Sequence, residues 1–121
     1  MEQKYKIGNE YGSIMWDVEK IINDKKHFEI REYNVKELAL SNPFFGDYKY
    51  AVQTDITQPL ILVQLTENID KLIDGNHRLQ KALKAGIETI AAYRLSFAEH
   101  HNYIVDYDEE VYRKVVEHWK S

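Results

Sequence analysis

The stretch that most constrains the fold of this chain runs from residue 58 to residue 95. It holds two short apolar runs, residues 60–65 and 69–73, and the three residues between them (Thr-Glu-Asn) favour a turn. Two apolar runs that flank a short polar turn are typical of a β-hairpin. We therefore expect two adjacent antiparallel strands at the centre of the fold.

The second half of this stretch predicts a helix and a further strand. The second apolar run ends in Asp-Gly, and apolar residues then recur at helical spacing over residues 76–85. Gly86 suits the C-terminal end of that helix, and residues 89–95 form a third apolar run. The predicted order is strand, turn, strand, helix, strand.

The junction between the second strand and the helix has an unusual charge pattern. Asp74 or Asn76 suits a helix N-terminus, but His77 and Arg78 place cations in the first turn, where they oppose the helix dipole by roughly 0.3–1 kcal/mol. A bound anion would turn this cost into a binding site. The alternative is that Arg78 pairs with Asp74 or Glu67 while His77 is simply solvated.

Several segments of this stretch resemble the ParB/sulfiredoxin superfamily. They are residues 58–63 (QPLILV), residues 72–79 (LIDGNHRL), Lys81-Ala82 and Gly86. The resemblance covers roughly residues 33–96, with residues 35–40 as the family's first strand. It implies a small nucleotide-binding fold in which the turn before the helix meets phosphates.

The resemblance also implies which residues form the site. A nucleoside triphosphate with Mg²⁺ is the expected ligand. Asp74 is the candidate Mg²⁺ ligand or general base, and His77 is the second candidate catalytic residue. The residues expected to bind the phosphates or the nucleotide are Gly75, Asn76, His77, Arg78 and Gln58.

The activities of this superfamily diverge, and the chain departs from each branch. Sulfiredoxins need a cysteine where Asn76 stands, and this chain has no cysteine, so sulfinic acid reduction is excluded. The CTP-dependent DNA clamps carry a helix-turn-helix domain and a Glu-Asn-x-x-Arg motif, for which residues 97–121 offer neither room nor match. The motif of the kinases that phosphorylate free serine is most similar to residues Asp74–Arg78 of this chain, but those kinases are larger proteins.

Two functions from different classes follow. The first is a nucleotide-binding domain that acts as a phosphotransferase or hydrolase. The second is a non-catalytic accessory module, DNA-associated or protein-binding, of the ParB-like nuclease type. Only Asp74 is well placed to reach a metal, with Asp70 and Glu67 doubtful, so binding is favoured over efficient catalysis.

Length and charge set the wider limits. A chain of 121 residues suits one domain, with the core at residues 33–96. The net charge of −4 gives no field that would attract a polyanion, so DNA binding is not favoured. No apolar run approaches about 18 residues and the N-terminus is polar, which predicts a cytoplasmic protein without membrane contact.

The flanking segments predict the rest of an α+β fold, a small mixed sheet flanked by helices. Residues 1–12 are expected to form a poorly ordered arm, residues 13–22 a helix, residues 33–40 a strand and residues 108–120 a C-terminal helix. Four aromatic residues lie close together in one short segment. We expect their side chains to pack in the core rather than to stack on a nucleobase. They are Phe44, Phe45, Tyr48 and Tyr50.

The core and one further polar cluster complete the predictions. Leu83 is expected to face the sheet, so that Leu83→Ala would cost about 2–5 kcal/mol. The histidines at 100 and 101 are expected to be solvated in a surface loop rather than to bind a metal. The residues expected in the core are Leu62, Ile73, Leu79, Leu83 and Trp119.

Overall fold

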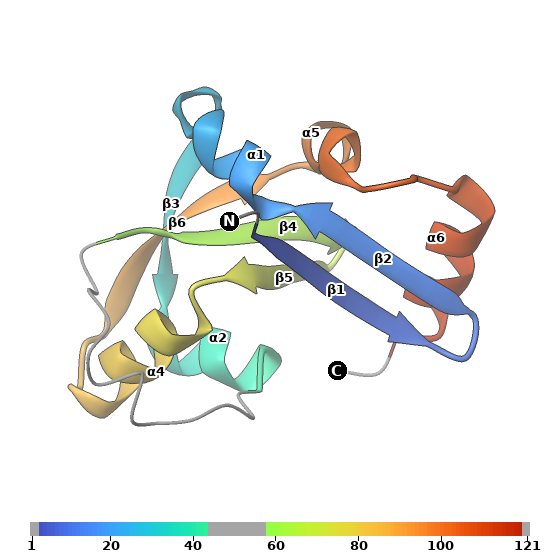
Figure 1. Ribbon diagram of the computed structural model, residues 1–121. Helices are drawn as coiled ribbons and strands as arrows, with labels where there is room; N and C mark the ends of the chain where they lie inside the picture. Colours follow the sequence, from blue (N-terminus) through green and yellow to red (C-terminus); the bar gives the residue numbers. More distant parts are fainter. Residues whose placement is uncertain (1–2, 44–57, 120–121) are drawn as a thin grey trace.

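A four-stranded mixed sheet lies at the centre of the computed structural model, which describes residues 3–43 and 58–119 (Figure 1). Its strands follow the order β3-β6-β4-β5, in which β6 and β4 are parallel and the two outer pairs are antiparallel. The bounds are β3 (Glu29–Asn34), β4 (Leu60–Thr66), β5 (Ile69–Asp74) and β6 (Thr89–Leu95).

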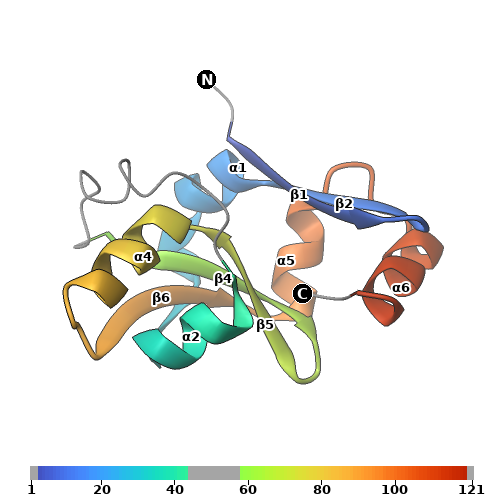
Figure 2. The ribbon, with the colours of Figure 1, turned by 90° about the horizontal axis from the view of Figure 1, so that it is seen from below.

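Two helices cover one face of this sheet. They are α2 (Val35–Ser41) and α4 (Asn76–Lys84), which lie side by side in both views (Figures 1 and 2). Because successive side chains of a strand point to opposite faces of the sheet, every second residue faces these helices and packs under them. The buried residues of this cluster are Val35, Leu38, Leu60, Leu62, Leu72, Leu79, Ala82, Ile90 and Ala92.

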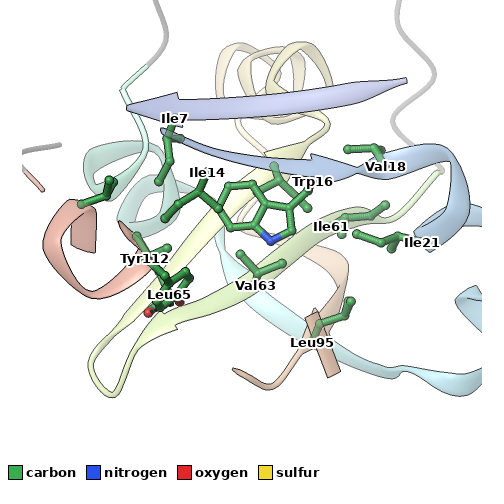
Figure 3. Packing of buried hydrophobic residues seen from close by; sticks show 12 residues of the cluster. Ile7, Ile14, Trp16, Val18, Ile21, Ile61, Val63, Leu65, Leu95 and Tyr112 are labelled. Atoms are coloured by element: carbon green, nitrogen blue, oxygen red, sulfur yellow. Dashed lines mark hydrogen bonds between the residues drawn. The ribbon is translucent and has the colours of Figure 1, made fainter. Parts of the chain in front are cut away.

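The opposite face is covered by an N-terminal hairpin and two further helices. The hairpin pairs β1 (Lys4–Asn9) with β2 (Gly12–Asp17). It continues into α1 (Val18–Asn23), and α6 (Glu109–Glu117) packs against β2. Trp16 lies fully buried between the hairpin and the sheet, among Ile14, Ile61 and Val63 (Figure 3).

Short helical segments join these elements. They are η1 (Lys25–His27) before β3, and α5 (Phe97–His100) with η2 (His101–Tyr103) after β6. No helix in the described part of the chain is long and apolar enough to cross a membrane.

The central predictions are confirmed. The two hairpin strands, the helix that starts at Asn76 and the strand over residues 89–95 all form, and Gly86 follows the helix with a φ of +74°. The C-terminal helix forms as α6, and the α+β class with a mixed sheet is correct.

The N-terminal predictions are wrong. Residues expected to form a disordered arm are strand β1, and the helix expected over residues 13–22 is strand β2 followed by α1. The apolar positions 14, 16 and 18 fit a strand as well as a helix, because Ile14, Trp16 and Val18 are all buried at a spacing of two. Pairing with β1 decides in favour of the strand.

The strand expected over residues 33–40 is also wrong. Strand β3 ends at Asn34, whose side-chain Oδ1 accepts a hydrogen bond from the Glu37 backbone N–H at 2.9 Å. This is an N-cap, and it starts α2 at Val35. The apolar residues of this segment therefore bury a helical face, with Val35 and Leu38 at a spacing of three.

The core prediction is wrong at one position. Leu62, Ile73 and Leu79 are buried, but Leu83 is 36% exposed. Residues 83–86 are all exposed, so the last turn of α4 does not pack into the core. Trp119 is partly buried against the core. The aromatic cluster at Phe44, Phe45, Tyr48 and Tyr50 lies outside the described residues.

Candidate functional site

The turn between β5 and α4 positions the predicted site. Asp74 is the last residue of β5, and Gly75 is the N-cap of α4 with a φ of +104°. The first hydrogen bond of the helix runs from the Leu79 N–H to the Gly75 carbonyl at 2.9 Å. The predicted strand-to-helix turn is therefore present.

Protein side chains make glycine necessary at this position. A Cβ on Gly75 would lie 2.5 Å from Leu60 Cδ2 and 2.9 Å from Arg78 Nη2. Leu60 is fully buried and cannot move freely. These contacts predict that any side chain at position 75 costs folding free energy, whatever it does to ligand binding.

We expect Gly75→Ala to lower the free energy of unfolding by about 1–3 kcal/mol, from backbone strain and the clash with Leu60. Gly86→Ala is the matched control, because Gly86 also has a positive φ but nothing lies within 4 Å of its Cβ position. Urea denaturation of both variants measures the difference. Equal losses would show that Leu60 and Arg78 do not restrict this turn.

Arg78 is held by two acceptors. Its Nη2 donates to Asp74 Oδ2 at 2.8 Å and to the Pro59 carbonyl at 3.3 Å. The side chains of Arg78 and Asp74 are only 18% and 20% exposed. The pairing of Arg78 with Asp74, one of the two alternatives in the sequence, is thus present. The Arg78 Nε is buried and has no hydrogen-bond partner among the described residues.

The N-terminus of α4 differs from those of the other α-helices. In α1, α2, α5 and α6 a side chain accepts a hydrogen bond from an N–H of the first turn; the capping residues are Asp17, Asn34, Ser96 and Asp108. Among the described α-helices, only α4 has no side-chain cap. The N-cap residue of α4, Gly75, thus offers no side-chain acceptor to the first turn of the helix.

A hollow of about 80 Å³ lies beside the Asp74–Arg78 pair. Its charged lining consists of Lys25, Arg78 and Asp74, which sum to +1 (two cations minus one carboxylate). The remaining lining residues are Ile22, Gln58, Pro59, Ile61 and Tyr93. The hollow thus places one anion-attracting charge next to apolar walls.

Three larger hollows have the opposite charge. One of about 360 Å³ is lined by Glu37, Glu67, Asp70 and Arg94, which sum to −2. The hollows of about 460 and 400 Å³ are also net negative, with −2 and −1 when histidine is counted as neutral. Of these four, only the hollow beside Arg78 is suited to an anion.

The structure brings together part of the predicted site. Gln58, Asp74 and Arg78 line the hollow, whereas Gly75, Asn76 and His77 belong to the adjoining turn and first helical residues and are not in its lining. His77 is partly buried.

The carboxylates considered as metal ligands do not meet. Asp70 and Glu67 line a different hollow from Asp74. There Asp70 accepts hydrogen bonds from the Tyr33 hydroxyl at 3.1 Å and from Arg94 Nη2 at 3.4 Å. Burial and the nearby Asp70 carboxylate raise the pKa of Tyr33 to about 12. In the described ranges no three His, Asp or Glu side chains form a group that could hold a metal ion.

Sequence reasoning missed Lys25 and Tyr93. Lys25 belongs to a Lys-Lys-His segment that lies about fifty residues before the turn. No spacing in the sequence links it to Arg78. The link arises because η1 follows α1 at the end of the sheet where Ile61 and Tyr93 lie.

Comparisons of this chain with protein-family models, with curated proteins and with solved structures find no match to any of them. The resemblance to the ParB/sulfiredoxin superfamily therefore stays a prediction, and the function has to be argued from the site itself.

Proposed function

We propose that this protein binds the phosphate groups of a nucleotide at the turn between β5 and α4. The observation that carries the proposal is the N-terminus of α4, which has no side-chain cap and adjoins the hollow that, of the four described above, has a net positive lining. First-turn N–H groups and the positive end of the helix dipole both favour an anion. Arg78 adds a side-chain donor at the same place.

The Asp74–Arg78 ion pair fits this proposal. The carboxylate holds the guanidinium in one orientation, so less side-chain freedom is lost when a phosphate binds. Arg78 has five N–H donors, and its two contacts with protein acceptors involve Nη2 alone. The other terminal nitrogen can serve a ligand.

A nucleoside triphosphate with Mg²⁺ remains the ligand we propose. Mg²⁺ commonly takes one or two protein carboxylates and completes its shell with phosphate oxygens and water. Asp74 is the residue that would supply the carboxylate. A single carboxylate suits binding better than efficient phosphoryl transfer, and His77 is the further candidate for chemistry in the first turn.

A nucleotide panel tests the proposal. ATP, ADP, CTP and GTP, each with and without Mg²⁺, are added during thermal or urea denaturation. A ligand at about a hundred times its dissociation constant stabilises the fold by about 2.7 kcal/mol. If no nucleotide stabilises the protein, the proposal is wrong and the accessory-module alternative takes its place.

We expect Arg78→Ala to weaken nucleotide binding by about 1.5–3 kcal/mol, the usual contribution of a charge-assisted hydrogen bond. Because Arg78 also pairs with Asp74, ligand-free stability should fall by about 1 kcal/mol. Calorimetric titration of the folded variant measures the affinity. Arg113→Ala is the control, since it removes an exposed arginine on α6. Equal affinity in the two variants would contradict a site at Arg78.

A further inference from the structure

We infer that Lys25 is the residue that selects the ligand by charge, so that the site prefers a diphosphate or triphosphate group over a single phosphate. This inference rests on the proposed function, because it concerns the same hollow. It adds a residue from outside the segment that resembles the ParB/sulfiredoxin superfamily, and it defines the ligand class by the charge of the group that enters.

The charge balance of the hollow depends on Lys25. The Arg78 guanidinium lies 2.8 Å from the Asp74 carboxylate, and these two charges largely cancel. Lys25 is exposed, and no carboxylate within residues 3–43 and 58–119 forms an ion pair with it. The net charge of +1 in the hollow is therefore the charge of Lys25, and without it the lining is neutral.

The size of the hollow limits what can enter it. The space inside the hollow is about 80 Å³, well below the roughly 300–1,000 Å³ of pockets that enclose a small-molecule ligand. A space of this size suits a phosphate group rather than a whole nucleoside. The hollow thus recognises the phosphate end of a ligand, and the rest of the ligand has to lie outside it.

The remaining walls strengthen the effect of the charge. Ile22, Ile61 and Pro59 give apolar surface, and Ile61 is buried. A charge acts more strongly on a ligand beside apolar walls than in open water. A second phosphate adds negative charge beside a hollow whose lining is net positive, so affinity should rise with the number of phosphates.

The test compares Lys25→Ala with Lys26→Ala, using pyrophosphate and inorganic phosphate as ligands. Lys26 is the matched control because it is the next residue of η1, is also exposed and does not line the hollow. Isothermal titration at constant ionic strength gives the affinities. We expect about tenfold weaker pyrophosphate binding in Lys25→Ala, near the lower limit for a charge-assisted contact, and less than about twofold change in Lys26→Ala.

The outcomes separate this inference from the proposed function. Lys25→Ala should also reduce the preference of the wild-type protein for pyrophosphate over phosphate. Equal affinities in Lys25→Ala and Lys26→Ala would overturn the inference about Lys25, while loss of nucleotide binding in Arg78→Ala would still support the site. Nucleotide binding without any pyrophosphate binding would also overturn the inference. If the protein bound none of these phosphate compounds, both the proposed function and the inference about Lys25 would be wrong.

Discussion

Replacing Leu79 by alanine is expected to lower the free energy of unfolding by about 2–5 kcal/mol, the usual cost of a cavity left by a buried leucine. Leu79 is fully buried between α4 and the sheet, in the same cluster as Leu60 and Leu62. Urea denaturation monitored by circular dichroism measures the change.

The matched control is Leu83→Ala, which removes the same atoms one turn further along α4. Leu83 is 36% exposed, so this variant should lose less than about 1 kcal/mol. Equal losses in the two variants would mean that Leu83 faces the sheet, as the sequence pattern alone predicted. A change in the slope of unfolding free energy against urea would instead indicate an altered unfolded state.

The difference between these leucines shows what helical spacing can predict. Leu79 and Leu83 lie four residues apart, so the pattern places them on the same face of a helix. It does not say how far along its axis the helix stays in contact with the sheet. Here residues 83–86 are all exposed, so the last turn of α4 lies outside the buried core.

A second limit concerns elements whose pattern suits two structures. Ile14 and Val18 fit a helix by their spacing of four, and with Trp16 they also fit a strand by their spacing of two. The choice depends on a partner strand, and β1 was predicted to be disordered. Strands β4, β5 and β6 were predictable because their apolar runs are bounded by turn residues within the same stretch.

The candidate site also combines residues that the sequence could predict with one that it could not. Asp74, Gly75 and Arg78 lie within five residues, so their proximity follows from local structure, and the ion pair could be proposed from the sequence. Lys25 reaches the hollow only through the packing of α1 and η1 on the sheet. Long-range packing of this kind leaves no pattern in a single sequence.

His100 is a further residue whose environment the sequence did not predict. It was expected to be solvated, yet it is fully buried at the end of α5. The Trp16 Nε1–H donates to His100 Nδ1 at 3.1 Å, which leaves His100 Nε2 as the donor to the Gln64 carbonyl at 2.8 Å. Both ring nitrogens are therefore used by the neutral form. A proton on Nδ1 would face the Trp16 N–H.

Acid should therefore destabilise the fold through His100. Burial lowers its pKa from 6.5 to about 4. Between these values the unfolded chain binds a proton that the folded protein does not, so the free energy of unfolding falls as the pH is lowered. The contribution of His100 is complete above pH 6.5 and decreases by about 3 kcal/mol as the pH approaches 4.

Urea denaturation of the wild-type protein and of His100→Gln at several pH values between 7 and 4 isolates this contribution. Glutamine does not titrate, so the variant should be less stable at pH 7 but should lose about 3 kcal/mol less than the wild type on acidification. His118→Gln is the control, because it makes the same substitution at an exposed histidine that follows α6. If His100→Gln kept the wild-type pH dependence, another group would be responsible for the acid sensitivity, and the neutral, doubly hydrogen-bonded state of His100 would not control it.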